Sequence, residues 1–225
     1  MIVSLNIADV GVARVPSLVS SPPKPRDVAG LRHADIGVTA PLSGSMLKSP
    51  TLGRVALIGF WDNERVLDNF IASNSRFDDL FVSGLSARLS PLRAHGTWPG
   101  LDNNVPKVRN VDHVGPVVVL TLARLRLSQT PRFFRASAKA EGAAINADGL
   151  IWATGIARPP FLSTCSIWDS DTSAQAYAYG HAATAHPSAI ASGNQKAFHK
   201  QEAFIRFHPS AMSGSLTGKN PLAVL

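Results

Sequence analysis

The sequence is poor in cysteine, in acidic side chains and in long apolar runs. Its single cysteine, Cys165, excludes an intramolecular disulfide, and no cysteine and histidine spacing typical of a zinc site is present. No stretch approaches the roughly 18 apolar residues of a membrane-spanning helix, and residues 1–6 lack the basic and apolar regions of a secretory signal. We therefore expect a cytoplasmic globular protein in which Cys165 is a small buried hydrophobe.

Sequence motifs of several enzyme classes are also missing. The glycine-rich residues 142–149 fit neither a Rossmann fingerprint nor a P-loop, which argues against a nucleotide cofactor. There is no Gly-x-Ser-x-Gly elbow of a serine hydrolase and no His-x-x-x-His pair of a non-haem metal site.

Acidic residues are scarce: 15 Asp and Glu against 22 Lys and Arg give a net charge of +7. The basic residues are scattered, with the densest group between residues 124 and 139. A nucleic-acid interface would need a compact basic stripe with interleaved aromatic residues, so we expect no nucleic-acid partner. Weak attraction to an anionic lipid surface or to an acidic ligand fits this charge equally well, and the first alternative predicts peripheral contact with a membrane.

Apolar periodicity in the first half predicts strands at residues 2–8, 54–61 and 80–89. Residues 62–73 form an expected helix, capped by Asp62 or Asn63. Between residues 9 and 53 the prolines and glycines predict turns, because a proline cluster interrupts a long helix.

The second half predicts the order β-α-β-β-α-β, which is the ferredoxin-like unit. Thr130 and Pro131 are suited to the N-cap and first position of its first helix. Two apolar runs flank the Ala157–Pro160 turn and predict a hairpin. The expected elements are a strand at 117–127, a helix from 130, strands at 150–156 and 161–168, helical residues 171–198 with a break at Gly180, and a strand at 203–208.

The two halves also resemble each other, which indicates an internal duplication. Residues 117–123 match residues 2–8 position for position, and three shorter matches follow in the same order: 147–148 with 34–35, 168–169 with 61–62, and 205–209 with 87–91. We therefore predict an α+β chain of tandem ferredoxin-like (βαββαβ) repeats forming an intrachain dimeric α/β-barrel-like fold. The first repeat, residues 1–114, is degenerate with a proline-rich insertion, and the second, residues 115–225, carries the site.

Several short segments resemble the spheroidene monooxygenase family of carotenoid ketolases. The resemblance is carried by residues 93–100, 166–169, 185–190, 198–201, 204–207 and 214–222. It implies a tandem dimeric α/β barrel that uses haem and molecular oxygen to oxidise an apolar polyene. Near its start the chain departs from the family, because the proline-rich segment replaces a helix of the characterised ketolases.

Haem iron commonly takes a proximal imidazole, and the resemblance favours His186 as the cofactor-binding metal ligand. His186 precedes Pro187, a residue suited to a helix start. His181 and His199 are the rival ligands. For His199 the ordinary alternative is a cation at the carbonyl end of a helix.

Three further residues complete the predicted cofactor site. Arg158, at the hairpin tip, could hold a haem propionate or an acidic group of a substrate, or be an exposed turn residue. Arg206 and its counterpart Arg88 lie within strands, where each must face solvent or pair with a carboxylate or propionate. Tyr179 could line an apolar pocket or belong to the core.

We carry three functional hypotheses from this sequence. The first is a haem-dependent monooxygenase of an apolar isoprenoid or carotenoid-like substrate, which needs molecular oxygen and an electron donor. The second is a cofactor-free barrel oxygenase or isomerase with His186 or Tyr179 as acid or base. The third is a non-enzymatic binder of haem or a lipophilic molecule, because one fold hosts many functions.

Overall fold

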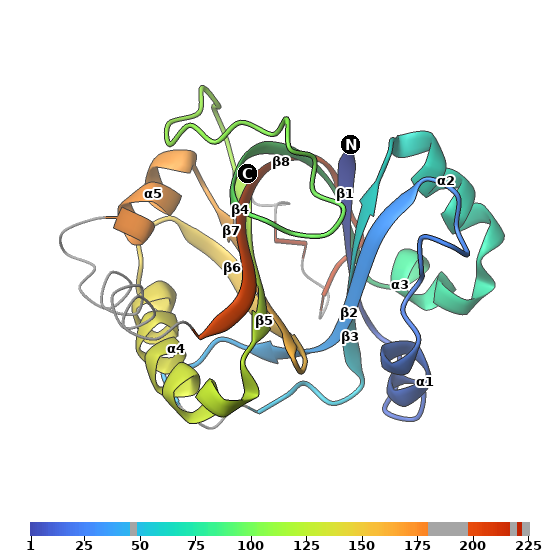
Figure 1. Ribbon diagram of the computed structural model, residues 1–225, viewed down its shortest axis with the longest axis horizontal. Coiled ribbons are helices and arrows are strands. Elements are labelled where there is room, and N and C mark those ends of the chain that lie inside the picture. The colour runs from blue at the N-terminus through green and yellow to red at the C-terminus, as the bar shows by residue number, and fades with distance from the viewer. Residues whose placement is uncertain (46–48, 180–197, 217–219, 222–225) are drawn as a thin grey trace.

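The computed structural model describes residues 1–45, 49–179, 198–216 and 220–221. Within these described residues, eight strands close into a barrel, and five α-helices lie on its outer side (Figure 1). The strands are β1 (Ile2–Asp9), β2 (Leu31–Pro41), β3 (Arg54–Trp61), β4 (Leu85–Gly96), β5 (Val117–Leu125), β6 (Leu150–Arg158), β7 (Phe161–Trp168) and β8 (His199–Ser213). The helices are α1 (Val15–Ser20), α2 (Glu64–Ser73), α3 (Asp78–Val82), α4 (Thr130–Ile145) and α5 (Asp171–Tyr179).

The barrel is two copies of one strand arrangement. The order around the barrel is β1-β3-β2-β6-β7-β5-β8-β4, so β4-β1-β3-β2 is repeated as β8-β5-β7-β6. The two sheets join where β2 pairs with β6 and β4 pairs with β8, and every neighbouring pair is antiparallel. The predicted tandem ferredoxin-like fold is thereby confirmed. The division at residues 114 and 115 stays a prediction.

Strand register shows the duplication residue by residue. Ile2 pairs with Trp61 across β1 and β3, and Val117 pairs with Trp168 across β5 and β7. Each tryptophan ends its strand and donates its indole N–H to a serine, Trp61 to Ser4 at 3.0 Å and Trp168 to Ser166 at 2.8 Å. Trp61 and Trp168 therefore occupy equivalent buried positions in the two halves, as the match of residues 168–169 with 61–62 predicts.

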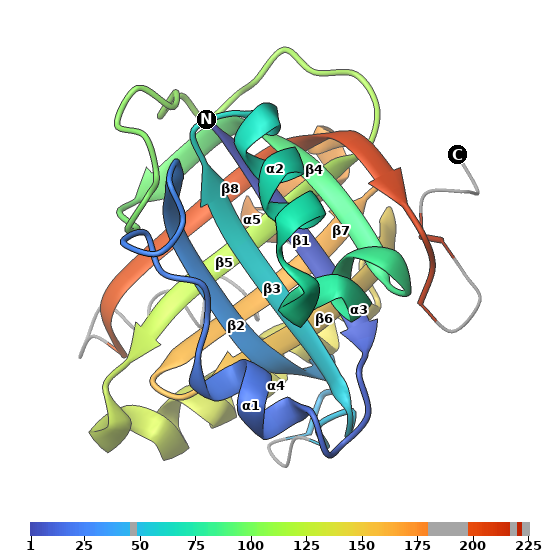
Figure 2. The same cartoon turned by 90° about the vertical axis from the view of Figure 1, so that its right-hand side faces the viewer.

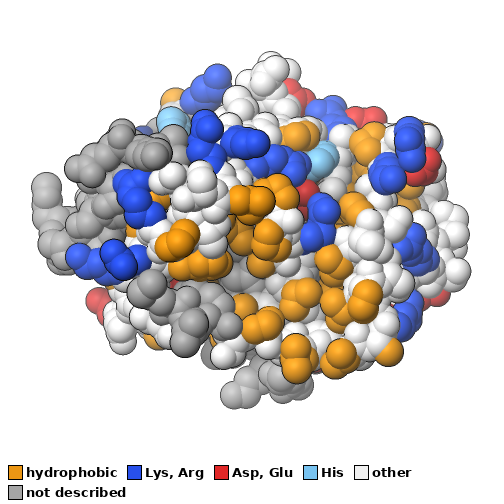
Figure 3. Space-filling view, turned by 60° about the horizontal axis from the view of Figure 1, so that its bottom comes forward, with side chains coloured by type: hydrophobic (Ala, Val, Ile, Leu, Met, Phe, Trp, Pro, Cys, Tyr) orange, Lys and Arg blue, Asp and Glu red, His pale blue; other side chains and the backbone are white. Residues whose placement is uncertain are grey.

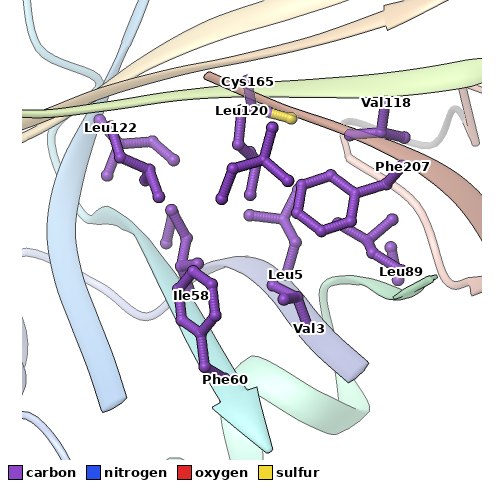
Figure 4. Packing of buried hydrophobic residues seen from close by; sticks show 14 of the residues in the cluster. Val3, Leu5, Ile58, Phe60, Leu89, Val118, Leu120, Leu122, Cys165 and Phe207 are labelled. Atoms are coloured by element: carbon purple, nitrogen blue, oxygen red, sulfur yellow. The ribbon is translucent and has the colours of Figure 1, made fainter. Parts of the chain in front are cut away.

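Side chains that alternate along the strands fill the barrel (Figure 4). Leu5, Ile58, Leu120 and Phe207 point toward one another from four strands and are fully buried. Cys165 lies in the same core with no exposed surface, which confirms the prediction for the thiol. Burial raises the pKa of the Cys165 thiol to about 12, so the thiol stays neutral.

The outer faces of the two halves are covered differently. Helices α1, α2 and α3 lie over the sheet of the first half (Figure 2), where Leu18, Leu57, Trp61, Leu67 and Leu80 form a large cluster. Helices α4 and α5 lie over the second half, where the outer apolar contacts of the described residues form two clusters, one around Trp168 and one around Phe198.

Several sequence predictions need correction. Residues 80–89 were expected as one strand, but Leu80–Val82 belong to α3, which buries Leu80 against the sheet, and β4 begins at Leu85. The region 9–53 contains α1 and the long strand β2 as well as turns. The match of residues 147–148 with 34–35 is not a structural equivalence, because residues 147–148 precede β6 whereas residues 34–35 lie inside β2.

Helix ends follow capping chemistry in most places. The Asn63 side chain accepts a hydrogen bond from the Val66 backbone N–H at 3.1 Å, so Asn63 caps α2 as predicted. The N-cap of α4 is Gln129, one residue before the predicted Thr130. Helix α5 ends at Tyr179, and the remainder of the predicted helical stretch 180–197 lies outside the described residues. Among the described residues no helix has the length and apolar character needed to cross a bilayer.

Candidate functional site

One mouth of the barrel carries charged and aromatic side chains instead of aliphatic ones. On β2, His33 and Asp35 share one face of the strand and lie opposite Phe60 and Ile58, which belong to the barrel core. Both side chains therefore point into the barrel. We call the group of His33, Asp35, Trp98, Arg124 and Arg158 the charged mouth.

Asp35 is the centre of the charged mouth, with only 2% of its surface exposed. Its carboxylate accepts hydrogen bonds from His33 Nε2 at 2.8 Å and from Trp98 Nε1 at 3.1 Å. The guanidinium groups of Arg158 and Arg124 lie 3.6 and 3.8 Å from the same carboxylate. This set of donors compensates a charge that would otherwise be costly to bury.

Both arginines of the charged mouth remain partly open to solvent. Arg158 donates Nε–H to the Ile36 carbonyl at 3.0 Å, and the Arg124 guanidinium lies 4.9 Å from the centre of the Trp98 ring. About a third of each arginine side chain is exposed. Two cations facing one carboxylate leave an excess of positive charge, which suits the acidic group of a ligand. The predicted role of Arg158 at a propionate or acidic group stays a prediction.

Arg206 and Tyr179 lie elsewhere, on the outer side of the second half. Arg206 forms an ion pair with Asp171 at 2.5 Å that ties the start of α5 to β8. Tyr179 ends α5, where its ring lies 3.8 Å from the guanidinium of Arg109 and 43% of the residue is exposed. The structure therefore gives Arg158, Arg206 and Tyr179 separate partners and does not bring them into one cluster. Their cofactor roles stay predictions.

The histidines differ in how their nitrogens are used. His186, the predicted ligand, and its rival His181 lie outside the described residues. His199 begins β8, and its Nδ1 lies 2.8 Å from Glu202 Oε2. Its Nε2 is buried and has no hydrogen-bond partner among the described residues. The hydrogen bond from His199 holds the pKa of Glu202 below its usual range.

Apolar rings surround His199 on the outer face of the second sheet. The Phe133 ring of α4 lies 5.4 Å from the imidazole ring, and the Phe198 ring lies 6.0 Å from it. Phe198 packs with Leu125 and Leu162 in one of the two small outer clusters. We call His199, Glu202, Phe133 and Phe198 the imidazole cluster.

The arrangement allows two kinds of chemistry. In the charged mouth, an imidazole held by a carboxylate can move a proton. At the imidazole cluster, an imidazole nitrogen without a partner is of the type that ligates a transition metal. The described part of the chain contains no group of three or more His, Cys, Asp or Glu side chains placed to hold a metal ion.

Sequence reasoning missed the charged mouth almost entirely. His33 and Asp35 alternate as same-face residues of a strand do, and that spacing was the available signal. It was hidden because the surrounding prolines and glycines were interpreted as turns. Trp98 and Arg124 reach the site from a loop and from β5, and no local pattern links them to β2.

The fold and site define a tandem ferredoxin-like α+β barrel with a charged mouth. A solved aldoxime dehydratase, OxdRE, in complex with butyraldoxime shares this fold at 8% identity, with a TM-score of 0.55 and coverage of 92% of this chain and 79% of that one. No protein-family model matches the sequence.

Sequence comparison identifies the family. The chain is 30% identical to the spheroidene monooxygenase of Rubrivivax gelatinosus over 175 residues, which is 76% of this chain and 66% of that protein. It is 31% identical to the spheroidene monooxygenase of Rhodobacter capsulatus over 142 residues, 62% of this chain and 58% of that protein. The chain belongs to a spheroidene monooxygenase-like family, as its sequence motifs predict. It spans about two thirds or less of the length of these relatives.

Proposed function

We propose that this chain is a monooxygenase that inserts one atom of molecular oxygen into an apolar, isoprenoid-like substrate. The observation that carries the proposal is the sequence relationship to two spheroidene monooxygenases. In such a reaction a C–H bond breaks, a C–O bond forms, and the second oxygen atom leaves as water. Two electrons and two protons are consumed, so the proposal includes an electron donor as partner.

Haem is the cofactor that the family resemblance implies, and we propose it for this chain. Among the described residues, His199 has a buried imidazole nitrogen without a hydrogen-bond partner, but that nitrogen is closely covered by the protein and leaves no room for a porphyrin. When bound, haem supplies activation of dioxygen and passage of electrons, which no side chain of the chain can provide. The predicted ligand His186 lies outside the described residues, so its role stays a prediction.

The residues of this chain would exclude water and hold an acidic group of the cofactor. Water exclusion is supported by a barrel interior in which Leu5, Leu120 and Phe207 are fully buried. An apolar isoprenoid has no acidic group, so at the charged mouth the cationic excess of Arg124 and Arg158 would serve a haem propionate.

A second candidate is the cofactor-free oxygenase or isomerase. The 2.8 Å contact between His33 and Asp35 favours it, because the carboxylate fixes the imidazole tautomer and stabilises its protonated form. Trp98 would hold Asp35 in place through its own hydrogen bond.

An apolar groove supports the predicted peripheral contact with a membrane, where an isoprenoid would reside. The groove has a volume of about 410 Å³ and is lined by α1, the β2–β3 connection and Ala157. Leu52 is 74% exposed there and Val12 is 61% exposed. Figure 3 shows hydrophobic side chains gathered on this face with Lys and Arg along its margin. A basic rim around an apolar patch suits an anionic lipid surface.

Two assays separate the hypotheses. Protein purified after haem-supplemented expression should be coloured, which would exclude the cofactor-free enzyme. Reduced, haem-loaded protein supplied with oxygen and a polyene should then consume the polyene, which distinguishes an enzyme from a binding protein. Full turnover of the polyene without haem would contradict the proposal and support the His33–Asp35 alternative.

A further inference from the structure

We propose that the charged mouth binds one carboxylate group between Arg124 and Arg158, and that Asp35 is the positioning residue that sets their guanidinium groups for it. A haem propionate and a free organic acid both offer this group, and the experiment separates the two sources. The inference deepens the proposed function and rests on it where haem is the source. Strand register, the hydrogen bonding of Asp35 and the charge balance of the chain carry it.

Strand register brings the two arginines to one point. Arg124 of β5 and Arg158 of β6 both pair with Phe161 of the intervening strand β7. Directly paired residues share a face of the sheet, and Phe161 belongs to the barrel core, so both arginines point into the barrel. Their Cα atoms are two strand spacings apart, about 10 Å. The long side chains bridge this distance, because both guanidinium groups lie within 4 Å of the same Asp35 oxygen.

The two oxygens of the Asp35 carboxylate have different partners. Oδ2 accepts the hydrogen bonds of His33 and Trp98. Oδ1 faces the arginines, with Arg158 Nη2 at 3.6 Å and Arg124 Nη2 at 3.8 Å. Both distances exceed those of a hydrogen bond, so the buried charge attracts the guanidinium groups without occupying their N–H donors. Asp35 thereby offsets the repulsion between two cations and keeps them close together.

The guanidinium donors remain open to a ligand. Arg158 uses its Nε–H for the Ile36 carbonyl, and Arg124 makes no hydrogen bond within the described residues, where it contacts the ring of Trp98. About a third of each arginine side chain is exposed, so a carboxylate reaches these donors from solvent without an enclosed cavity. A guanidinium presents its N–H groups in a fixed fork that matches the two oxygens of a carboxylate.

The chain offers no second acid to this pair of cations. In the described part of the chain, Asp35 is the one carboxylate within ion-pair distance of either arginine. The residues outside the described ranges include no Asp or Glu, so they supply no side-chain carboxylate. A carboxylate from a ligand would therefore balance the second cation.

A porphyrin ester tests the site. The haem-free full chain is titrated with haemin and with haemin dimethyl ester, whose carboxylates are blocked, and binding is followed by absorption. Wild type should bind haemin about tenfold more tightly than the ester, as expected for a charge-assisted hydrogen bond. Arg124→Gln and Arg158→Gln should each remove most of this preference and leave the affinity for the ester unchanged. A preference that survives both substitutions would overturn the inference.

Two controls separate direct binding from net charge and from misfolding. Arg135→Gln removes the same charge from an exposed position on α4 and should keep the wild-type preference for haemin. An equal loss in Arg135→Gln would show a general effect of net charge and would contradict the site. Circular dichroism of every haem-free variant should match that of the haem-free wild type.

Asp35→Asn tests the positioning role. The amide oxygen still accepts hydrogen bonds from His33 and Trp98, whereas the charge that holds the two guanidinium groups together is lost. The variant should therefore show a weaker preference for haemin over the ester than wild type does. An unchanged or stronger preference would contradict the role of Asp35.

Calorimetry with sodium propionate on the haem-free chain separates the two sources of the carboxylate. Saturable binding that Arg158→Gln abolishes, together with equal affinities for haemin and its ester, would assign the site to a free organic acid. If wild type neither prefers haemin to the ester nor binds propionate saturably, the inference is overturned while haem binding stands. If wild type binds neither porphyrin, the haem cofactor is wrong, and the propionate titration alone decides the inference.

Discussion

Arg88 and Arg206 occupy equivalent strand positions, but their ion pairs lie in different surroundings. Arg206 and its partner Asp171 have side chains only 7% and 8% exposed. Arg88 pairs with Asp68 and Glu64, whose side chains are about half exposed. Loss of Asp171 would leave the buried charge of Arg206 uncompensated. Loss of Asp68 would let water solvate the charge of Arg88 instead.

This difference predicts unequal effects of removing the acid. Asp171→Ala should lower the free energy of unfolding by about 3–5 kcal/mol, because Arg206 would remain buried without a counter-charge. Asp68→Ala, the matched variant in the first half, should cost about 0–1 kcal/mol. Urea unfolding followed by circular dichroism measures both values. Equal losses would contradict the assignment of Arg206 to an internal ion pair.

Cys165 should be unreactive in the folded protein. Burial raises its pKa from 9.0 to about 12, so the folded state holds the thiol proton more tightly than the unfolded state does. The contribution of the neutral Cys165 thiol to the free energy of unfolding is fully present below about pH 9 and is lost as the pH rises toward 12.

A thiol reagent tests this expectation. Ellman's reagent at pH 8 should release no chromophore from the native protein and one equivalent after unfolding in urea. Tyr177 offers an independent readout in a Tyr179→Phe background, because burial raises the pKa of Tyr177 to about 12 as well, and the ultraviolet difference spectrum of that variant should show ionisation only at the alkaline unfolding transition. Rapid labelling of native protein would show that the barrel interior is open to reagents.

At the scale of elements, two glycines end equivalent strands with the same conformation. Gly96 is the last residue of β4, at φ +85°, and Gly214 follows β8 directly, at φ +75°, a region that disfavours residues with a side chain. A Cβ at Gly96 would overlap the Glu202 carbonyl, and one at Gly214 would overlap the Gly84 carbonyl. Trp98 and Leu216, which follow these glycines, both reach the barrel core.

Substitution of Gly96 or Gly214 should therefore lower the free energy of unfolding by more than the strain of a positive φ alone would. Gly96→Ala should destabilise the protein by about 2–4 kcal/mol, combining a positive φ with overlap of the neighbouring backbone. Gly11→Ala is the control, since Gly11 has φ +78° and open space around it, and it should cost about 1–2 kcal/mol. Thermal unfolding of the two variants measures the difference. A smaller loss for Gly96→Ala than for Gly11→Ala would contradict the close approach of β4 and β8.

Local sequence patterns predicted the strands that consist of an uninterrupted run of mostly apolar residues. β3 spans Arg54–Trp61 as predicted, and the β6–β7 hairpin turns at Pro159 and Pro160 as predicted. β2 was missed because the prolines and glycines around it predict turns over residues 9–53. β4 was placed too early because the apolar residues from Leu80 onward pack as a helix.

The candidate site depends on long-range closure that no local pattern contains. The charged mouth joins residues of β2, β5, β6 and the loop after β4, which meet only when the two repeats close the barrel. Arg158 was chosen from the sequence for its rigid turn, yet its partner Asp35 was not. His199 was weighed as a rival ligand, but its unpartnered nitrogen is visible only in three dimensions.

At the scale of the whole molecule, the apolar groove with its basic margin predicts membrane binding. Wild type should bind vesicles of phosphatidylglycerol and phosphatidylcholine, and salt should weaken the binding. Leu52→Ser should weaken it about tenfold, because burial of a leucine side chain contributes about 1.5 kcal/mol. Val114 is 94% exposed in the loop between β4 and β5, so Val114→Ser should have no effect. Equal weakening by both substitutions would contradict a specific docking face.

The most direct test of the proposed oxygenase is isotopic. Reduced, haem-loaded protein is supplied with spheroidene in detergent micelles under ¹⁸O₂, and the product is analysed by mass spectrometry after a short reaction. We predict a product that carries ¹⁸O from the gas and none from labelled water in the reciprocal experiment. A product labelled only from water, or no product from protein that binds haem fully, would contradict the proposed function.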